Sequence, residues 1–162
     1  IVWLKLNRMK TKNLFLVGLI LVFISCNNKK IFSEYKTDFK SNQWQKNDVK
    51  LFDIAIDDES KNYDVTLSIS HVFDYQFDKV PVTISIKNPK GETEIMNIDL
   101  IIKDATGKDK GDCLGDICDL KQTFKTNTKL IKGNYVISVA HTFNNSYLPN
   151  ISSLGLDVTL SE

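Results

Sequence analysis

Apolar and polar residues alternate with a period of two along most of the chain after residue 44. In residues 63–69 the odd positions are apolar and the even ones polar, and residues 82–87 and 156–161 repeat this alternation. Such a pattern packs one face of a strand and leaves the other in water, as in antiparallel sheets. We predict seven strands from it, over residues 50–56, 62–73, 80–88, 93–103, 117–126, 133–143 and 153–160.

Turn-forming residues separate these strands, among them Asp-Asp-Glu-Ser at 57–60 and Asn-Pro-Lys-Gly at 88–91. No stretch after residue 26 shows a convincing helical period. Short strands with regular turns predict an all-β fold, an antiparallel two-sheet β-sandwich of the jelly-roll or immunoglobulin-like type. Pro81 cannot donate to a ladder, so we expect it at a sheet edge or as the first residue of its strand.

The beginning of the chain has a different pattern. Lys10 and Lys12 precede Leu14–Ile24, a run of 11 residues that is apolar except for Gly18. A helix that spans a bilayer needs roughly 20 residues, so this run fits the apolar helix of an export signal that begins at Met9. Residues 1–8 are then an upstream extension. The alternative is a buried helix of the domain itself.

The end of the apolar run, Phe23-Ile24-Ser25-Cys26, resembles the lipobox cut by lipoprotein signal peptidase. The small Ser25 would let the peptidase reach the bond, and the Cys26 thiol would carry the diacylglycerol that anchors the protein, at about 0.8 kcal/mol per buried CH₂. An ordinary secretory signal with an incidental cysteine is the alternative. We therefore expect an extension plus signal peptide over 1–25, a lipidated tether over 26–43 and a β-sandwich over 44–162.

Charge and composition argue against several classes of function. Four of the 21 basic residues and none of the 20 acidic ones lie in residues 1–25, which leaves the mature chain with a net charge of about −3. This balance argues against nucleic acid as a partner. Two histidines leave little material for catalysis, and no nucleophile with a base and an orienting group can be assembled. We expect a protein that is not an enzyme and has no cofactor.

Cys113 and Cys118 form an even pair once Cys26 is acylated, and they would lie in an oxidising compartment. A disulfide between them is the favoured interpretation, and two free thiols are the alternative. A zinc site is disfavoured, because C-x₄-C lacks two further ligands, so we predict no metal here. By the loop-entropy model, so small a ring stabilises at the low end of roughly 2–4 kcal/mol.

Residues 104–119 are rich in aspartate. Carboxylates on a flexible loop could suit Ca²⁺, but the spacing does not match an EF-hand, and a solvated hairpin loop explains them equally well. These aspartates are Asp104, Asp109, Asp112, Asp116 and Asp119.

Both histidines follow the apolar phase of their strands, so we interpret His71 and His141 as half-buried sheet residues. Several aromatic residues could line a sugar- or peptide-binding face, although aromatic residues of sheets belong more often to the core. They are Trp44, Tyr75, Phe77, Phe143 and Tyr147.

The order of several short motifs resembles a known family. These are the lipobox, the Trp44 segment, Tyr-Asp-Val-Thr-Leu-Ser-Ile-Ser-His at 63–71, Asp-Ala-Thr-Gly-Lys at 104–108, Lys-Gly-Asn-Tyr at 132–135 and Leu-Pro-Asn-Ile at 148–151. Over about residues 26–160 the chain is similar to the gliding motility lipoprotein GldH family of the Bacteroidota.

This resemblance implies a non-catalytic part of the envelope machinery for gliding and type IX secretion. Its partners would be the outer membrane, through the acyl chains, and other envelope proteins. Asn-Asn-Lys-Lys at 27–30 stands where surface-exported lipoproteins often carry acidic residues, which favours the periplasmic face. A carbohydrate-binding or adhesion lipoprotein is the alternative function.

Overall fold

The computed structural model describes residues 29–162. The predicted export signal and Cys26 lie outside the described residues. The fold is built from strands that follow the alternating pattern, with one short 3₁₀ helix. In chain order the elements are β1 (Lys30–Lys36), η1 (Lys40–Asn42), β2 (Gln43–Gln45), β3 (Lys50–Ile56), β4 (Asn62–Val72), β5 (Lys79–Lys87), β6 (Thr93–Ile101), β7 (Asp112–Leu114), β8 (Ile117–Lys129), β9 (Gly133–His141), β10 (Tyr147–Pro149) and β11 (Ile151–Leu160).

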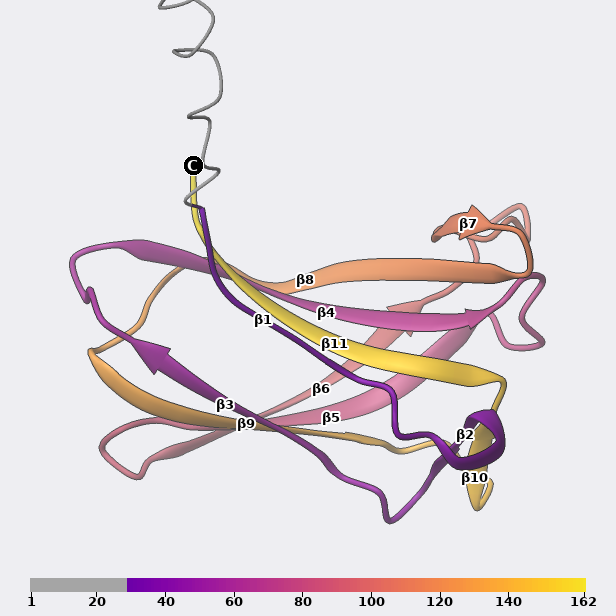
Figure 1. Ribbon diagram of the computed structural model, residues 1–162, viewed down its shortest axis with the longest axis horizontal. Helices are drawn as coiled ribbons and strands as arrows, with labels where there is room; N and C mark the ends of the chain where they lie inside the picture. Colours follow the sequence, from indigo (N-terminus) through magenta and orange to yellow (C-terminus); the bar gives the residue numbers. More distant parts are fainter. Residues whose placement is uncertain (1–28) are drawn as a thin grey trace, which may run out of the picture.

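Two antiparallel sheets form the two layers seen in Figure 1. One has the strand order β1-β11-β4-β8-β7 and the other β3-β9-β5-β6, with the β2–β10 pair at one end of the sandwich. Among the long strands, every connection except β5–β6 changes sheet. This is the jelly-roll arrangement, in which two Greek keys roll up together. The predicted sandwich is confirmed, and its strand order is not immunoglobulin-like, where most neighbours in sequence share a sheet.

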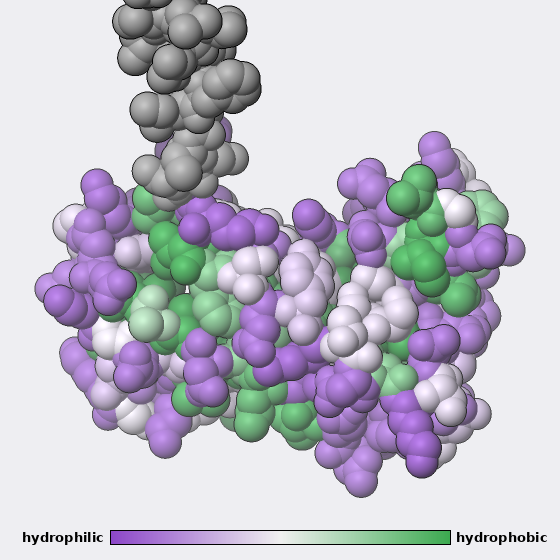
Figure 2. Space-filling model, viewed as in Figure 1, coloured by the Kyte–Doolittle hydropathy of each residue, from purple (hydrophilic) through white to green (hydrophobic). Residues whose placement is uncertain are grey.

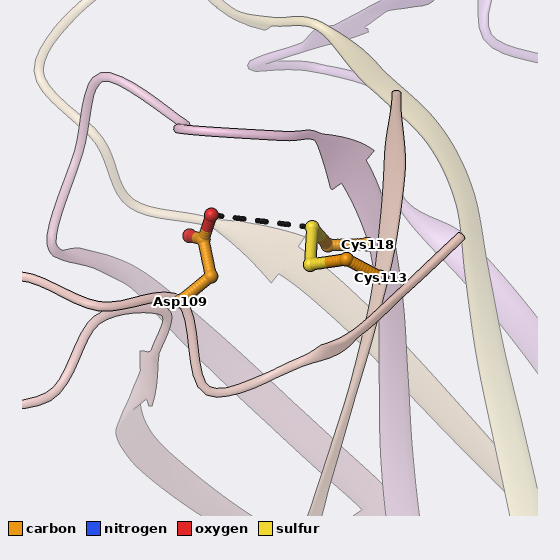
Figure 3. A group of neighbouring side chains, drawn as sticks. All are labelled: Asp109, Cys113 and Cys118. Carbon is orange, nitrogen blue, oxygen red and sulfur yellow. Dashed lines mark hydrogen bonds between the residues drawn. A yellow bond between two sulfur atoms is a disulfide. The ribbon is translucent and has the colours of Figure 1, made fainter. Parts of the chain in front are cut away.

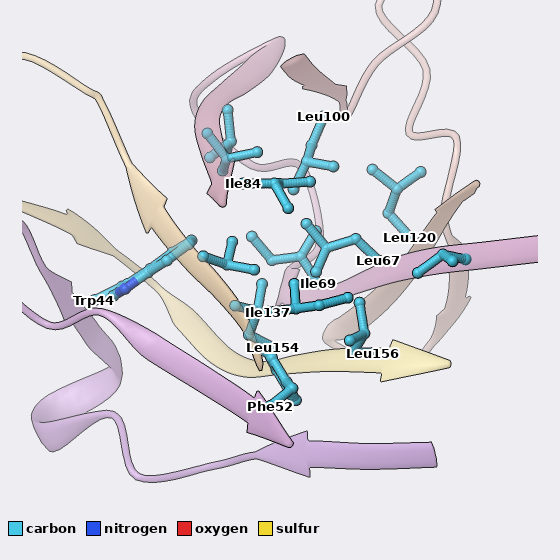
Figure 4. Close-up of a cluster of buried hydrophobic side chains, with 14 of the residues drawn as sticks. Trp44, Phe52, Leu67, Ile69, Ile84, Leu100, Leu120, Ile137, Leu154 and Leu156 are labelled. Atoms are coloured by element: carbon cyan, nitrogen blue, oxygen red, sulfur yellow. The ribbon is translucent and has the colours of Figure 1, made fainter. Parts of the chain in front are cut away.

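The core lies between the layers and takes one face of each long strand, as the alternation predicts. In β3 and β5 every second side chain is buried. Figure 4 shows these side chains pointing toward one another from both sheets. The labelled members are Trp44, Phe52, Leu67, Ile69, Ile84, Leu100, Leu120, Ile137, Leu154 and Leu156.

From Lys30 on, the residues expected in the tether over 26–43 belong to the fold instead. Residues 30–36 form β1, an edge strand that pairs with β11, and Phe32 packs against the core. The sequence of β1 is dominated by polar residues because both sides of an edge strand are largely exposed, so its pattern resembles that of a linker. The three short strands β2, β7 and β10 were also not predicted, since three residues carry too little alternation to be recognised.

Pro81 does not lie at a sheet edge or at the start of its strand. It is the third residue of β5, an inner strand of its sheet. Pairing with β9 begins only at Val82, so Pro81 lies just outside that ladder. The Thr142 N–H still donates to the Pro81 carbonyl at 2.9 Å, and the return bond is the one that Pro81, without an N–H group, cannot form, so the ladder ends here.

Candidate functional site

The predicted cysteine pair lies in a tight hairpin. Cys113 in β7 and Cys118 in β8 are direct cross-strand partners, and their sulfur atoms are bonded in the structure, as Figure 3 shows. Only Gly115 and Asp116 lie between the paired ends of the two strands, and Gly115 has a φ of +62°. A glycine with positive φ at the first position of a two-residue turn is typical of a type II′ hairpin. The two-residue turn thus places the two cysteines directly opposite each other.

Asp109 is the one acidic side chain beside the sulfur atoms. Its carboxylate lies 4.0 Å from the Cys118 sulfur and also accepts the backbone N–H of Asp74 at 2.9 Å. Over residues 29–162, this group of Asp109 and the two cysteines is the one place where three ligand-type side chains converge. Bonded to each other, the sulfurs are not thiolates, so the group offers a metal a single carboxylate.

The other aspartates of this loop do not share a site in the structure. Asp104 accepts backbone N–H groups of Thr106 and Lys108 and thereby caps its own turn. The Thr106 hydroxyl also donates to this carboxylate, and together with the two backbone hydrogen bonds it holds the pKa of Asp104 below its ordinary value. Asp119 pairs with the Ser70 hydroxyl on the neighbouring strand. These two carboxylates are thus occupied singly, Asp104 at its own turn and Asp119 against the neighbouring strand.

The two histidines are fully buried, and the expectation of half-burial is wrong. His71 and His141 are 0% and 2% exposed. The His141 Nε2 atom lies 3.0 Å from the Trp44 carbonyl oxygen, to which it donates, and the two rings make an edge contact. Burial lowers the pKa of His141 below its ordinary 6.5, although this hydrogen bond opposes the shift. Both side chains line the core because the inward-facing alternation of β4 and β9 continues to the ends of these strands.

Most of the aromatic residues belong to the core. Trp44 and Tyr75 are completely buried, and Phe77 stacks on Phe143 with ring centroids 4.5 Å apart. The Tyr75 hydroxyl donates to the Pro149 carbonyl at 2.9 Å. These rings close one end of the sandwich. These four rings therefore do not form an exposed aromatic platform, and of the five aromatic residues considered for a sugar-binding face Tyr147 is the exposed one, at 36%.

A buried cation was not predicted from sequence. Lys50, at the start of β3, is 3% exposed, and its ammonium group lies 3.0 Å from Asp38 and 2.8 Å from Asp48. It also lies over the Phe39 ring, 4.4 Å from the centroid. Desolvation disfavours the charged lysine, but hydrogen bonds to both carboxylates outweigh it and raise its pKa. This cluster fixes the segment that leads from β1 to β3.

The outer face of the four-stranded sheet carries a row of uncharged side chains across all four strands. One row of cross-strand neighbours runs through Leu51, Ser138, Ser85 and Ile95. Leu51 and Ile95 are 51% and 67% exposed. Small side chains between two exposed apolar ones leave room for a partner to approach closely, as the centres of protein interfaces require.

A second group of exposed apolar side chains lies at the other sheet. Figure 2 shows apolar atoms gathered over β7 and the start of β8, where Leu114, Ile117 and Phe73 are exposed. The protein therefore has exposed apolar side chains on both layers. Within the described part of the chain, no helix has the length and apolar character needed to span a bilayer.

Fold and sites together define a class: a compact jelly-roll module with a bonded hairpin and exposed apolar faces, suited to binding. The family model of the GldH lipoprotein matches residues 30–158, almost the entire sandwich. The chain belongs to this family, and the resemblance seen in its motifs is confirmed.

Two relatives support the assignment. The chain is 27% identical over 148 residues to a gliding motility lipoprotein GldH of Flavobacterium johnsoniae, covering 91% of each chain. It is 26% identical over 121 residues to a gliding motility lipoprotein GldH homolog of Christiangramia forsetii, covering 74% of this chain and 73% of the relative. The similarity thus extends over the whole fold rather than over one motif.

Proposed function

We propose that this protein is a non-catalytic component of the gliding motility and type IX secretion machinery, anchored in the outer membrane through Cys26 and facing the periplasm. The observation that carries the proposal is the family match across residues 30–158. A lipid anchor at the N-terminal side and a rigid sandwich after it suit a protein that acts by holding a binding surface near a membrane.

The anchor is arranged to present the sandwich close to the bilayer. β1 begins at Lys30, only four residues after Cys26. A fully extended chain spans at most about 3.6 Å per residue, so the sandwich would lie within about 15 Å of the lipidated residue. Partners would therefore be reached in or next to the membrane, through sheet faces such as the Leu51–Ile95 row.

Deletion of the gene in the source organism tests the role in motility. We expect the deletion to abolish spreading on agar and the wild-type gene to restore it. Normal spreading of the deletion strain would overturn the proposed role. A pull-down from detergent-solubilised envelope, with the native lipoprotein as bait, would identify the partner proteins.

A Cys26→Ser chain tests the anchor separately. We expect it to take up no alkyne-labelled fatty acid, to leave the membrane fraction and not to restore spreading. The matched control is the Cys113→Ala/Cys118→Ala chain, which keeps Cys26 and should be labelled as strongly as the wild type. Equal labelling of the Cys26→Ser chain would show that the anchor lies elsewhere.

A further inference from the structure

A cavity of about 350 Å³ lies between the two sheets, at the end where β4 begins and β8 ends. Its floor is aliphatic and comes from both layers, with Ile56, Ile86 and Ile137 on one side and Val65 and Val158 on the other. Protein interiors contain few voids larger than a water molecule. This cavity opens to solvent on one side, and its volume lies within the range of small-molecule sites with an apolar interior and a few polar groups.

Three lysines stand at the mouth of the cavity: Lys90, Lys125 and Lys129. The Lys125 ammonium group is paired with the Glu94 carboxylate at 2.8 Å, and Lys129 donates to the Ser60 carbonyl at 2.6 Å. Lys90 forms no ion pair with any residue between 29 and 162. Two of the three cations are thus without an acidic partner in this part of the chain.

Two acidic residues share the mouth, and both already have partners. Glu94 is held by Lys125, and Glu92 accepts the Asn88 side-chain amide at 2.7 Å. Three lysines against two glutamates leave a net positive charge at the mouth, on a mature chain whose net charge is about −3. The local charge therefore favours an anionic group over a cationic one.

The mouth lies close to the point where the chain enters the sandwich. The Lys29 carbonyl accepts the Leu160 N–H, Leu160 pairs with Tyr63, and Tyr63 pairs with Thr128, which lines the cavity. These residues follow one another across the sheet, so three strand spacings, about 14 Å, separate Lys29 from Thr128. A protein tethered through the residues just before Lys29 holds this cavity near a lipid surface.

We propose that the cavity binds a single acyl chain whose anionic end lies against the lysines of the mouth. The aliphatic floor would take the hydrocarbon, since each buried methylene removes apolar surface from water. Lys90 and Lys129 would meet the head group. A free fatty acid and a lysophospholipid share this chemistry, one ending in a carboxylate and the other in a phosphate.

The test uses the mature chain with Cys26→Ser, which needs no detergent that would compete for the cavity. Displacement of 11-(dansylamino)undecanoic acid, whose emission rises in an apolar site, reports binding. The competitors are octanoate, decanoate and laurate below their critical micelle concentrations, dodecanol as the uncharged match to laurate, and lauroyl lysophosphatidylglycerol. We expect affinity to rise about fourfold per added methylene and laurate to bind more tightly than dodecanol.

The two anionic competitors distinguish the two kinds of ligand. Tighter binding of laurate indicates a fatty acid, and tighter binding of the lysophospholipid indicates a ligand with a phosphate head group. Either result supports the acyl site. An absence of binding by both anions, or an affinity that does not depend on chain length, would overturn it. The cavity would then be a place for an apolar side chain of a protein partner.

Variants connect the binding to this cavity. Glu94 is the cross-strand partner of Ile86, so Glu94→Trp would place an indole across the mouth and should weaken every competitor at least tenfold. Asn97→Trp adds the same bulk on the outer face of the same strand and should leave binding unchanged.

The double variant Lys90→Gln/Lys129→Gln should weaken the binding of laurate about tenfold and leave the binding of dodecanol unaffected. The control is Lys121→Gln, which lies on β8 like Lys129 but away from the cavity. Thermal melting of each variant reports its folding. If Glu94→Trp does not fold, the Lys90→Gln/Lys129→Gln variant tests the proposal by itself. If this double variant still binds laurate more tightly than dodecanol, by the same factor as the wild type, the proposal is contradicted.

Discussion

At the residue scale, burial decides how polar side chains behave in this fold. His141 follows the same alternation as its apolar neighbours, yet it reaches the core with one nitrogen bonded to Trp44 and the other, Nδ1, without a partner among residues 29–162. Lys50 reaches the core with two carboxylates around it. A buried charge needs such partners, whereas a buried histidine can remain neutral instead.

The His141 environment predicts a pH dependence of stability. Its pKa in the folded protein lies below 6.5, so the unfolded chain binds more protons in the range just below that value. The free energy of unfolding should therefore fall as the pH drops from 7 to 5, by at most about 1.4 kcal/mol per pH unit from this group. Urea unfolding at several pH values measures it.

The matched variants are His141→Gln, which should flatten this slope, and Tyr147→Phe at an exposed position, which should keep it. A His141→Gln chain with the wild-type slope would show that other groups govern stability in this range.

At the element scale, β1 is held by an unusual side-chain contact across its ladder. Tyr35 is the direct partner of Gly155 in β11, and its ring occupies the space that a side chain at position 155 would need. An aromatic ring over a glycine on a neighbouring strand compensates for the missing side chain and defines the register. The glycine is therefore required by its neighbour rather than by its own backbone.

We predict that Gly155→Val destabilises the protein by about 1–3 kcal/mol, because the new side chain displaces the Tyr35 ring. In a Tyr35→Ser background the same substitution should cost much less, since the obstacle is gone. A double-mutant cycle of urea unfolding measures this coupling. Equal costs in both backgrounds would show that the ring does not oppose the side chain.

The β7–β8 hairpin gives a second prediction at this scale. By the loop-entropy model, replacing both cysteines by alanine should lower the free energy of unfolding by about 2 kcal/mol. Treatment of the wild type with a reductant should produce the same loss, and should add two hydrogens to its mass. A wild-type chain whose mass and stability do not change under reduction would instead carry free thiols in solution.

At the scale of the whole molecule, the jelly roll separates its surfaces by role. The end near Lys29 lies next to the proposed anchor and the cavity, the other end is closed by packed aromatic rings, and the outer face of the four-stranded sheet is free for a partner. A fold of this kind does not by itself define a function. In this protein one rigid core positions the end with the cavity, the end closed by aromatic rings and the outer sheet face relative to one another.

We predict that Leu51→Lys/Ile95→Lys removes partner capture in the pull-down, because it places a charge at each end of the uncharged row. Both residues are exposed, so the free energy of unfolding should change by less than about 0.5 kcal/mol per site. The control is Lys121→Ser on the other sheet, which should capture the same proteins as the wild type. Unchanged capture by the double variant would assign the contact to another face.

Much of the fold could be predicted from the sequence. Residues 50–56 and 62–73 were predicted as strands and form β3 and β4 with ends that agree within one residue. The cavity could not be predicted, because Ile56 and Val158 belong to strands far apart in the chain that face each other only after both sheets have formed. The Lys50 cluster could not be predicted either, because Asp38 and Asp48 are brought to the lysine by the irregular segment between β1 and β3.

The sequence by itself determined the seven predicted strands, the hairpin cysteines and the family, because alternation, turn residues and motif order are local properties of the chain. The tertiary structure alone decided that residues 30–36 form an edge strand, that the sandwich is a jelly roll and that a void with a cationic mouth remains between its layers. The physical reason is that strand order and the gap between sheets depend on contacts between distant segments, which no local pattern records.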